Sequence, residues 1–164
     1  MDSVRDLREV FRDRFGDAFR IEDVDPARRG VCLDISVPAT DIEEAVSLLD
    51  ARGFALEAIT AIDWPAEEAM ELDHDAVDWP AEEAMELVYD FNKMKNGGRV
   101  ALRVRVPRAT PELPSISKIY GGADWYEREA HEMFGIVFSG HPNLVPLILP
   151  EDADFHPLRK DYAP

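Results

Sequence analysis

The chain has 164 residues, 46% of them hydrophobic, and a formal net charge of −16. This length fits one domain with a hydrophobic core, and no stretch approaches the roughly 20 apolar residues that cross a bilayer. The charged N-terminus lacks the apolar core of a signal peptide, so we expect a cytoplasmic protein that meets a membrane only through partners. Such an acidic field repels phosphate backbones and argues against nucleic-acid binding.

A single cysteine, Cys32, excludes an internal disulfide. It also excludes an iron–sulfur cluster or a Cys-rich zinc site built by this chain alone. Because Cys32 lies in the alternating run 31–35, we expect it in the core.

The N-terminal third predicts a helix, a strand, a second helix and a second strand. Residues 3–15 carry apolar residues at helical spacing, and residues 31–37 alternate as a half-buried strand does. Thr40 and Glu43 form a capping box before the second helix, which Gly53 ends. Residues 54–62 read as the next strand.

An acidic tandem repeat follows. Residues 61–75 and 76–90 share the run Asp-Trp-Pro-Ala-Glu-Glu-Ala-Met-Glu-Leu. Two copies are too few for a solenoid, so we interpret residues 63–77 as a duplicated acidic loop insertion. We expect Met85 to Leu87 of the second copy to form a strand, with both of these end residues facing the core. Met70 to Leu72 of the first copy should lie in an exposed loop or short helix outside the sheet.

Alternation at 85–91 and 100–106 around the turn residues 96–98 predicts a hairpin. Prolines then break the chain before a last helix. The order of elements indicates an α+β fold, a mostly antiparallel sheet with helices packed on it and an extended Pro-rich C-terminal tail. We expect an α+β domain over 1–135 and an extended docking tail over 136–164, since the tail has too little periodicity to bury itself.

The run 124–135 predicts a helix that Asp124 caps and Gly135 ends. Arg128 can pair with Glu132, and Glu127 with His131, one turn apart. Taken alone, this pattern fits a surface helix with ordinary ion pairs. A metalloprotease motif is excluded because Gly135 stands where a second histidine is required. Nothing marks a sugar site for glycosidase chemistry, and the spacing of the histidines at 131, 141 and 156 matches no standard metal site.

Three pieces in this order carry a specific resemblance: residues 125–136, Gly140-His141-Pro142, and 156–162. Together they resemble the 30 kDa subunit family of respiratory complex I, the NADH-quinone oxidoreductase. This family includes subunits of energy-converting nickel–iron hydrogenases. The resemblance covers about residues 28–162, and 147–152 looks more like the hydrogenase-linked branch.

The resemblance implies a cofactor-free peripheral subunit on the cytoplasmic side of the membrane, with no active site of its own. It implies docking on the large hydrogenase-like, quinone-site subunit, beside iron–sulfur subunits, in a complex that carries iron–sulfur clusters with FMN or a nickel–iron centre. The residues expected to dock are Glu127, Arg128, Glu129, Glu132, Phe134, Gly135, His141, Pro142, His156, Pro157, Leu158, Arg159, Lys160 and Asp161.

Two other functions stay open from the residues. The chain can be an independent enzyme that uses Glu127, Glu129 and His131. It can also be a stand-alone acidic module that binds a basic protein through the repeat and has no redox role.

Overall fold

The computed structural model describes residues 4–16, 19–65, 83–94 and 98–163. Its elements are α1 (Val4–Phe15), β1 (Arg20–Asp23), α2 (Pro26–Arg29), β2 (Leu33–Ser36), the 3-10 helix η2 (Ala39–Asp41), α3 (Ile42–Asp50), β3 (Ala55–Trp64), β4 (Ala84–Lys93), β5 (Gly98–Pro107), β6 (Glu112–Pro114), α5 (Ala123–Phe134) and β7 (Val137–Ser139). The α+β class is confirmed.

The main sheet has the order β1-β2-β5-β4-β3, and only the β2–β5 pairing is parallel. The three long strands β3, β4 and β5 form its body. β6 and β7 make a separate parallel pair. Regular structure therefore continues past Gly135 into the segment expected to be tail. Beyond β7 the described residues contain turns but neither helix nor strand.

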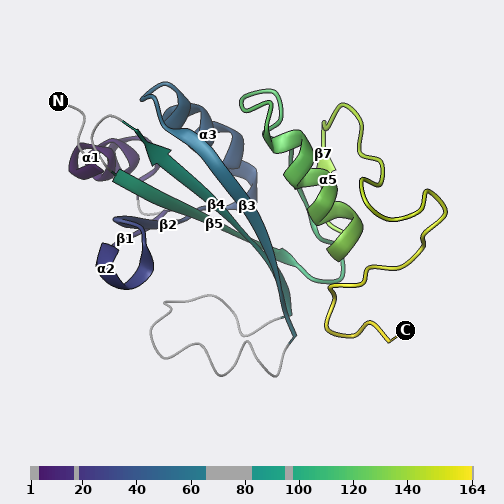
Figure 1. The fold of residues 1–164 in the computed structure, drawn as a ribbon. Helices are drawn as coiled ribbons and strands as arrows, with labels where there is room; N and C mark the ends of the chain where they lie inside the picture. The colour runs from purple at the N-terminus through teal and green to yellow at the C-terminus, as the bar shows by residue number, and fades with distance from the viewer. Residues whose placement is uncertain (1–3, 17–18, 66–82, 95–97, 164) are drawn as a thin grey trace.

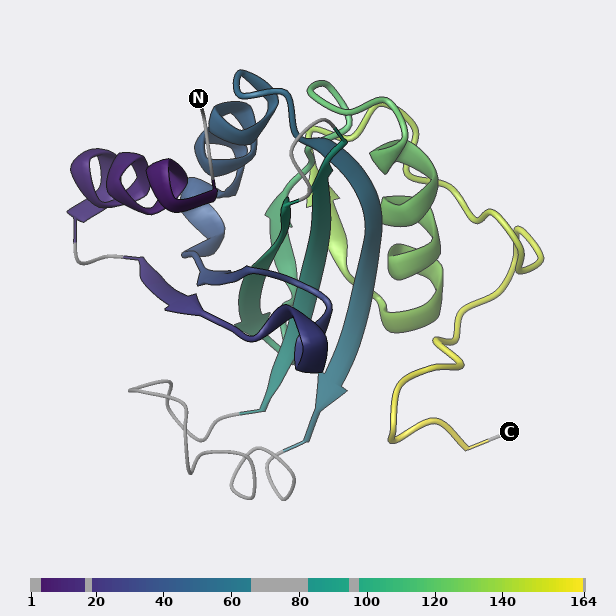
Figure 2. The ribbon, with the colours of Figure 1, turned by 60° about the vertical axis from the view of Figure 1, so that its left-hand side comes forward.

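One hydrophobic core lies between the sheet and the helices. The odd-numbered residues of β4 from Met85 to Phe91 are buried on this side, with side chains of α1, α3 and α5 against them. Each fully buried large apolar side chain contributes about 1.5–3 kcal/mol. In both views α5 and α2 lie on opposite sides of the long strands. The C-terminal segment, residues 140–163, runs outside α5 (Figures 1 and 2).

The two copies of the repeat are described to different extents. Met85 and Leu87 of the second copy lie in β4 and face the core, as predicted. Asp63 and Trp64, which begin the first copy, end β3. The prediction for Met70 to Leu72 falls outside the described residues.

Two local predictions are wrong. Thr40 does not cap α3: its hydroxyl donates to the Asp41 carboxylate at 3.1 Å, and η2 precedes the helix instead. Cys32 was expected in the core but is half-buried. It lies just before β2, which begins at Leu33. Gly53 follows α3 with a φ of +74°, which agrees with the predicted stop. None of the helices in the described part of the chain is long and apolar enough to span a membrane.

Candidate functional site

Helix α5 carries five of the fourteen residues expected to dock, and Gly135 follows it directly. It begins at Ala123 after Gly122, without a side-chain cap, so the predicted cap by Asp124 is wrong. It ends at Gly135, whose φ of +78° and N–H bond to the His131 carbonyl agree with the prediction. Its inner side packs on β3 and its outer side meets the C-terminal segment (Figure 1).

Glu127 is the inward carboxylate of α5 and is fully buried. It accepts bonds from the Ser115 hydroxyl at 2.5 Å and from the Ile116 N–H at 2.7 Å. Burial raises the pKa of the Glu127 carboxyl to about 7, and Asp124 adds to this rise, although the bonds from Ser115 and Ile116 act in the opposite direction. Glu127 therefore ties α5 to the segment after β6 and does not pair with His131, which contacts the Ile136 carbonyl.

His141 closes this cluster from the C-terminal side. Its Nδ1 accepts from the Asn143 N–H at 3.0 Å, so the ring proton is on Nε2. That atom lies 3.0 Å from an Asp124 oxygen and 3.8 Å from Glu127, with an orientation that makes a close contact rather than a hydrogen bond. The predicted docking residue His141 is thus buried at its side chain, and it fixes the start of the segment.

Arg128 and Glu132 clamp the chain after His141. Arg128 donates to the carbonyls of Val145 and Pro146, both at 2.9 Å. Glu132 accepts from the three successive N–H groups of 147–149 at 2.8–3.0 Å. Burial opposes the charge of Glu132, but these amides outweigh it and lower its pKa. Each side chain binds backbone of the C-terminal segment, whereas helical spacing alone predicts a bond between the two.

The end of α5 holds the run that starts at His156. The His156 Nδ1 donates to the Glu132 carbonyl at 2.9 Å, and the Leu158 N–H donates to the Met133 carbonyl at 3.1 Å. A Cβ at Gly135 would lie 2.8 Å from the His156 ring. Gly135 therefore serves both the left-handed turn and the close approach of the ring.

An ion-pair group around the buried Asp63 and Arg108 holds the last residues. Arg108 donates to both Asp63 oxygens at 2.6 and 2.9 Å and pairs with Asp161 at 2.9 Å. The Lys160 N–H also donates to Asp63, at 2.8 Å. Burial works against the Asp63 charge, but the bonds from Arg108 and Lys160 prevail and lower its pKa. Sequence reasoning missed Arg108, which follows Pro107 in a stretch whose prolines predict only a chain break.

These contacts correct one expectation. The sequence predicts a C-terminal segment with few contacts of its own, yet its backbone is bonded to α5 and to the end of β3. Its exposed side chains include several large apolar ones. Seven of the eight large apolar side chains exposed in the described residues fall between 125 and 162: Trp125, Val137, Val145, Ile148, Phe155, Leu158 and Tyr162.

The remaining predicted residues have less defined roles. Glu129 and Pro142 are exposed, Phe134 and Pro157 are half-buried, and Arg159 lies 3.4 Å from Asp161. Among the described residues, no three His, Cys, Asp or Glu side chains gather as a metal site would require.

Known proteins match this chain along most of its length. An NADH-quinone oxidoreductase subunit of Salinispora arenicola is 35% identical over 98% of the chain and 60% of the relative. A trypsin-resistant fragment of Nqo5 has a TM-score of 0.62 at 29% identity, covering 84% of this chain and 98% of the fragment. A chain of the membrane-bound sulfane sulfur reductase, an archaeal respiratory membrane complex, shares the fold: its TM-score is 0.73 at 24% identity, over 99% of this chain and 86% of that one.

The chain spans only 30–60% of the length of the curated NADH-quinone oxidoreductase subunits that it matches first. The sequence profile of the respiratory-chain NADH dehydrogenase 30 kDa subunit matches residues 35–164, which include every side chain of the clamp on the C-terminal segment. The chain therefore belongs to the 30 kDa subunit family of the respiratory-chain NADH dehydrogenase.

Proposed function

We propose that the protein is a cofactor-free peripheral subunit of a complex I-like NADH:quinone oxidoreductase or of a related membrane-bound nickel–iron hydrogenase. It docks on the large quinone-site subunit, on the cytoplasmic side of the membrane, and helps to assemble the electron-transfer arm. The redox centres, iron–sulfur clusters with FMN or nickel–iron, belong to other subunits.

The observation that supports docking is that the C-terminal segment has bonded backbone groups but exposed apolar side chains. Its backbone groups are bonded to Arg128, Glu132 and Asp63, so the segment is held in shape before a partner arrives. Several of its apolar side chains remain in solvent, with Ile148 64% and Leu158 54% exposed. Large apolar side chains exposed together in one segment are a feature of interaction sites. A pre-formed surface also binds at a smaller entropic cost.

Replacement of exposed apolar side chains tests this proposal. Ile148→Ser and Leu158→Ser should each lower the amount of large subunit recovered with the tagged protein, because apolar area at the interface is lost. Met94→Ser is the matched control, since Met94 is 84% exposed but lies directly after β4, outside the segment. All three isolated variants should melt like the wild type, as exposed positions change stability by about 0.5 kcal/mol or less.

Wild-type recovery and wild-type NADH:quinone activity in both segment variants would contradict docking through this surface. Arg128→Ala should also reduce assembly, through the loss of its bonds to the Val145 and Pro146 carbonyls. The isolated wild-type chain should be colourless, and stoichiometric iron, zinc or flavin in it would contradict the cofactor-free part of the proposal.

A further inference from the structure

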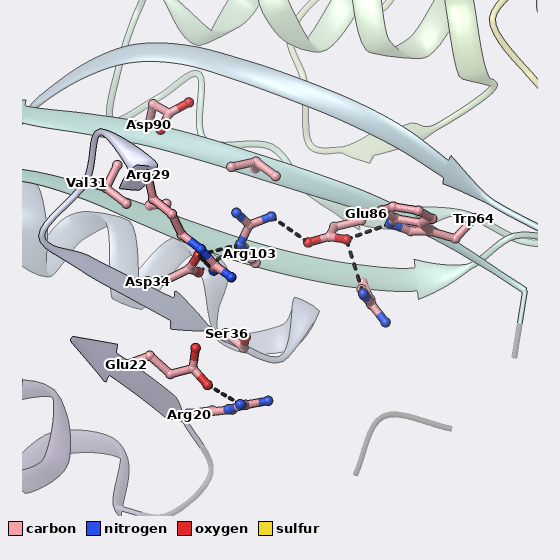
Figure 3. Close-up of a pocket in the computed structure, with 13 residues that line it drawn as sticks. Arg20, Glu22, Arg29, Val31, Asp34, Ser36, Trp64, Glu86, Asp90 and Arg103 are labelled. Atoms are coloured by element: carbon pink, nitrogen blue, oxygen red, sulfur yellow. Dashed lines mark hydrogen bonds and ion pairs between the residues drawn. The ribbon is translucent and has the colours of Figure 1, made fainter. Parts of the chain in front are cut away.

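A pocket of about 530 Å³ lies on the sheet face that the main core does not use. Its floor is formed by even-numbered residues of β4 with neighbours on β2 and β5, and one wall by β1 and α2 (Figure 3). This volume is within the range of small-molecule sites, roughly 300–1,000 Å³. The pocket is distinct from the C-terminal segment, and the inference drawn from it does not depend on docking.

The fold makes the pocket concave. β1 pairs with β2 at the sheet edge, and α2 follows it. Asp25 caps α2 through the Ala27 N–H, and Gly30 ends it with a φ of +73°. This turn brings Arg29 over the sheet, next to the small apolar cluster of Val31, Val88 and Ala101. The position of Arg29 is thus set by the backbone of α2, which Asp25 and Gly30 cap at its two ends.

The charges in the pocket are arranged in depth. The lining has four arginines, Arg20, Arg29, Arg103 and Arg105, and four carboxylates, Glu22, Asp34, Glu86 and Asp90. The two central carboxylates lie underneath, since the side chains of Asp34 and Glu86 are only 6% and 4% exposed. The arginine side chains are more exposed, from 25% for Arg105 to 58% for Arg29.

Arg103 is fixed between the two buried carboxylates. Its Nε donates to Asp34 at 2.8 Å and its Nη1 donates to Glu86 at 3.0 Å. Glu86 is also held by the Trp64 indole N–H at 2.6 Å. Arg29 is held differently: it approaches Asp34 only to 3.7 Å, which is beyond hydrogen-bond length. Its planar fork of N–H donors therefore remains available on the solvent side.

We propose that this pocket binds a small anion with two or more carboxylate or phosphate oxygens, through the fork of Arg29 and beside the positive charge of the fixed Arg103. Arginine is suited to both groups, because its fork matches two oxygens at once. The buried carboxylates orient the arginines without occupying the outer side of the pocket. Of the two other carboxylates, Glu22 in the wall is already paired with Arg20. Burial is the main cause that raises the pKa of the half-buried Asp90, so its negative charge is disfavoured there.

Titration of the full chain with citrate and with inorganic pyrophosphate tests the proposal, with sodium chloride matched for ionic strength. Saturable shifts of the Arg29 and Arg103 side-chain N–H signals in NMR spectra are expected with at least one of the two probes. The probe that binds more tightly identifies the ligand as a carboxylate or a phosphate.

Arg29→Gln should weaken binding about tenfold, as the loss of a charge-assisted bond does, and Arg29→Lys should lie between this variant and the wild type. Arg28→Gln is the matched control: it makes the same charge change one residue earlier in α2, outside the pocket lining. Its affinity should stay within about twofold of the wild type. The absence of saturable binding, or equal weakening by the variants at 28 and 29, would overturn the proposal.

Discussion

Deletion of one copy of the acidic repeat should leave the fold intact and make it more stable. Trp64 pairs with Ala84, so residues 65–83 form a 19-residue connection between β3 and β4. Removal of residues 63–77 rejoins Ile62 to Asp78, and Asp78 and Trp79 then stand where Asp63 and Trp64 stood. The connection shrinks to Pro-Ala-Glu-Glu, a four-residue loop of ordinary hairpin length.

The expected gain follows from loop closure. The cost of closing a flexible loop scales as 1.5RT ln n, so shortening from 19 to four residues contributes about 1.4 kcal/mol. For a chain of this size that is a rise in melting temperature of about 3–6 °C. Six acidic residues are also lost, which changes the net charge from −16 to −10. The buried bonds of Asp63 to Arg108 and Lys160 are kept, because an aspartate still occupies their place.

Thermal unfolding at two salt concentrations measures the gain and separates its two sources. The matched control keeps the full length but neutralises six acidic residues, by Glu67→Gln, Glu68→Gln, Glu71→Gln, Asp73→Asn, Asp75→Asn and Asp78→Asn. This variant also has a charge of −10, so only charge relief can stabilise it, and salt should abolish its gain. The deletion should keep its gain at high salt.

Two results would refute the reasoning about the repeat. One is a large fall in melting temperature on deletion. The other is faster hydrogen exchange in β4, because it would mean that the first copy supplies contacts that the second cannot replace.

Three further substitutions have definite expected outcomes. The raised pKa of Glu127 means that the folded state binds a proton more tightly than the unfolded state, so the contribution of Glu127 to stability should fall by about 3 kcal/mol as pH rises from 4.5 to 7. Glu127→Gln should remove this contribution from the slope of stability against pH in urea titrations, and an unchanged slope would contradict the assignment. Gly135→Ala should cost about 1–3 kcal/mol in denaturant unfolding, from the left-handed backbone and the His156 ring; a wild-type midpoint would mean that the ring moves freely. Arg108→Leu should cost about 3–5 kcal/mol, because the buried Asp63 carboxylate loses its cationic partner. Adding Asp63→Leu should restore much of the loss, whereas additive losses would count against the pair.

The sequence predicted those elements whose pattern is local and strongly periodic. The alternation in β4 and β5 predicted both the hairpin and its buried side, and Gly135 marked the end of α5 through the backbone it requires. β1 was missed because Arg20–Asp23 is short and mostly charged. The parallel pairing of β2 with β5 joins residues 33 and 100, and no local pattern carries that information.

In the site, too, the sequence indicated the side chains within one helix but not their partners in distant parts of the chain. Glu127 and Glu132 were recognised as important, but helical spacing cannot tell that one accepts from Ser115 and the other from the amides of 147–149. Their partners lie in irregular chain, where sequence periodicity predicts nothing. Arg108 is the clearest omission, because its partner Asp63 is 45 positions away.

The parallel pairing of β2 with β5 also has a consequence for folding kinetics. β3, β4 and β5 join neighbours along the chain, whereas β2 gains its inner neighbour only after residue 100 has been made. Contacts of such high sequence separation slow folding. During synthesis, β2 therefore leaves the ribosome with an unpaired inner edge and waits for most of the chain, a state prone to aggregation. A nascent chain stalled before β5 should depend on chaperones, while one released after it should not.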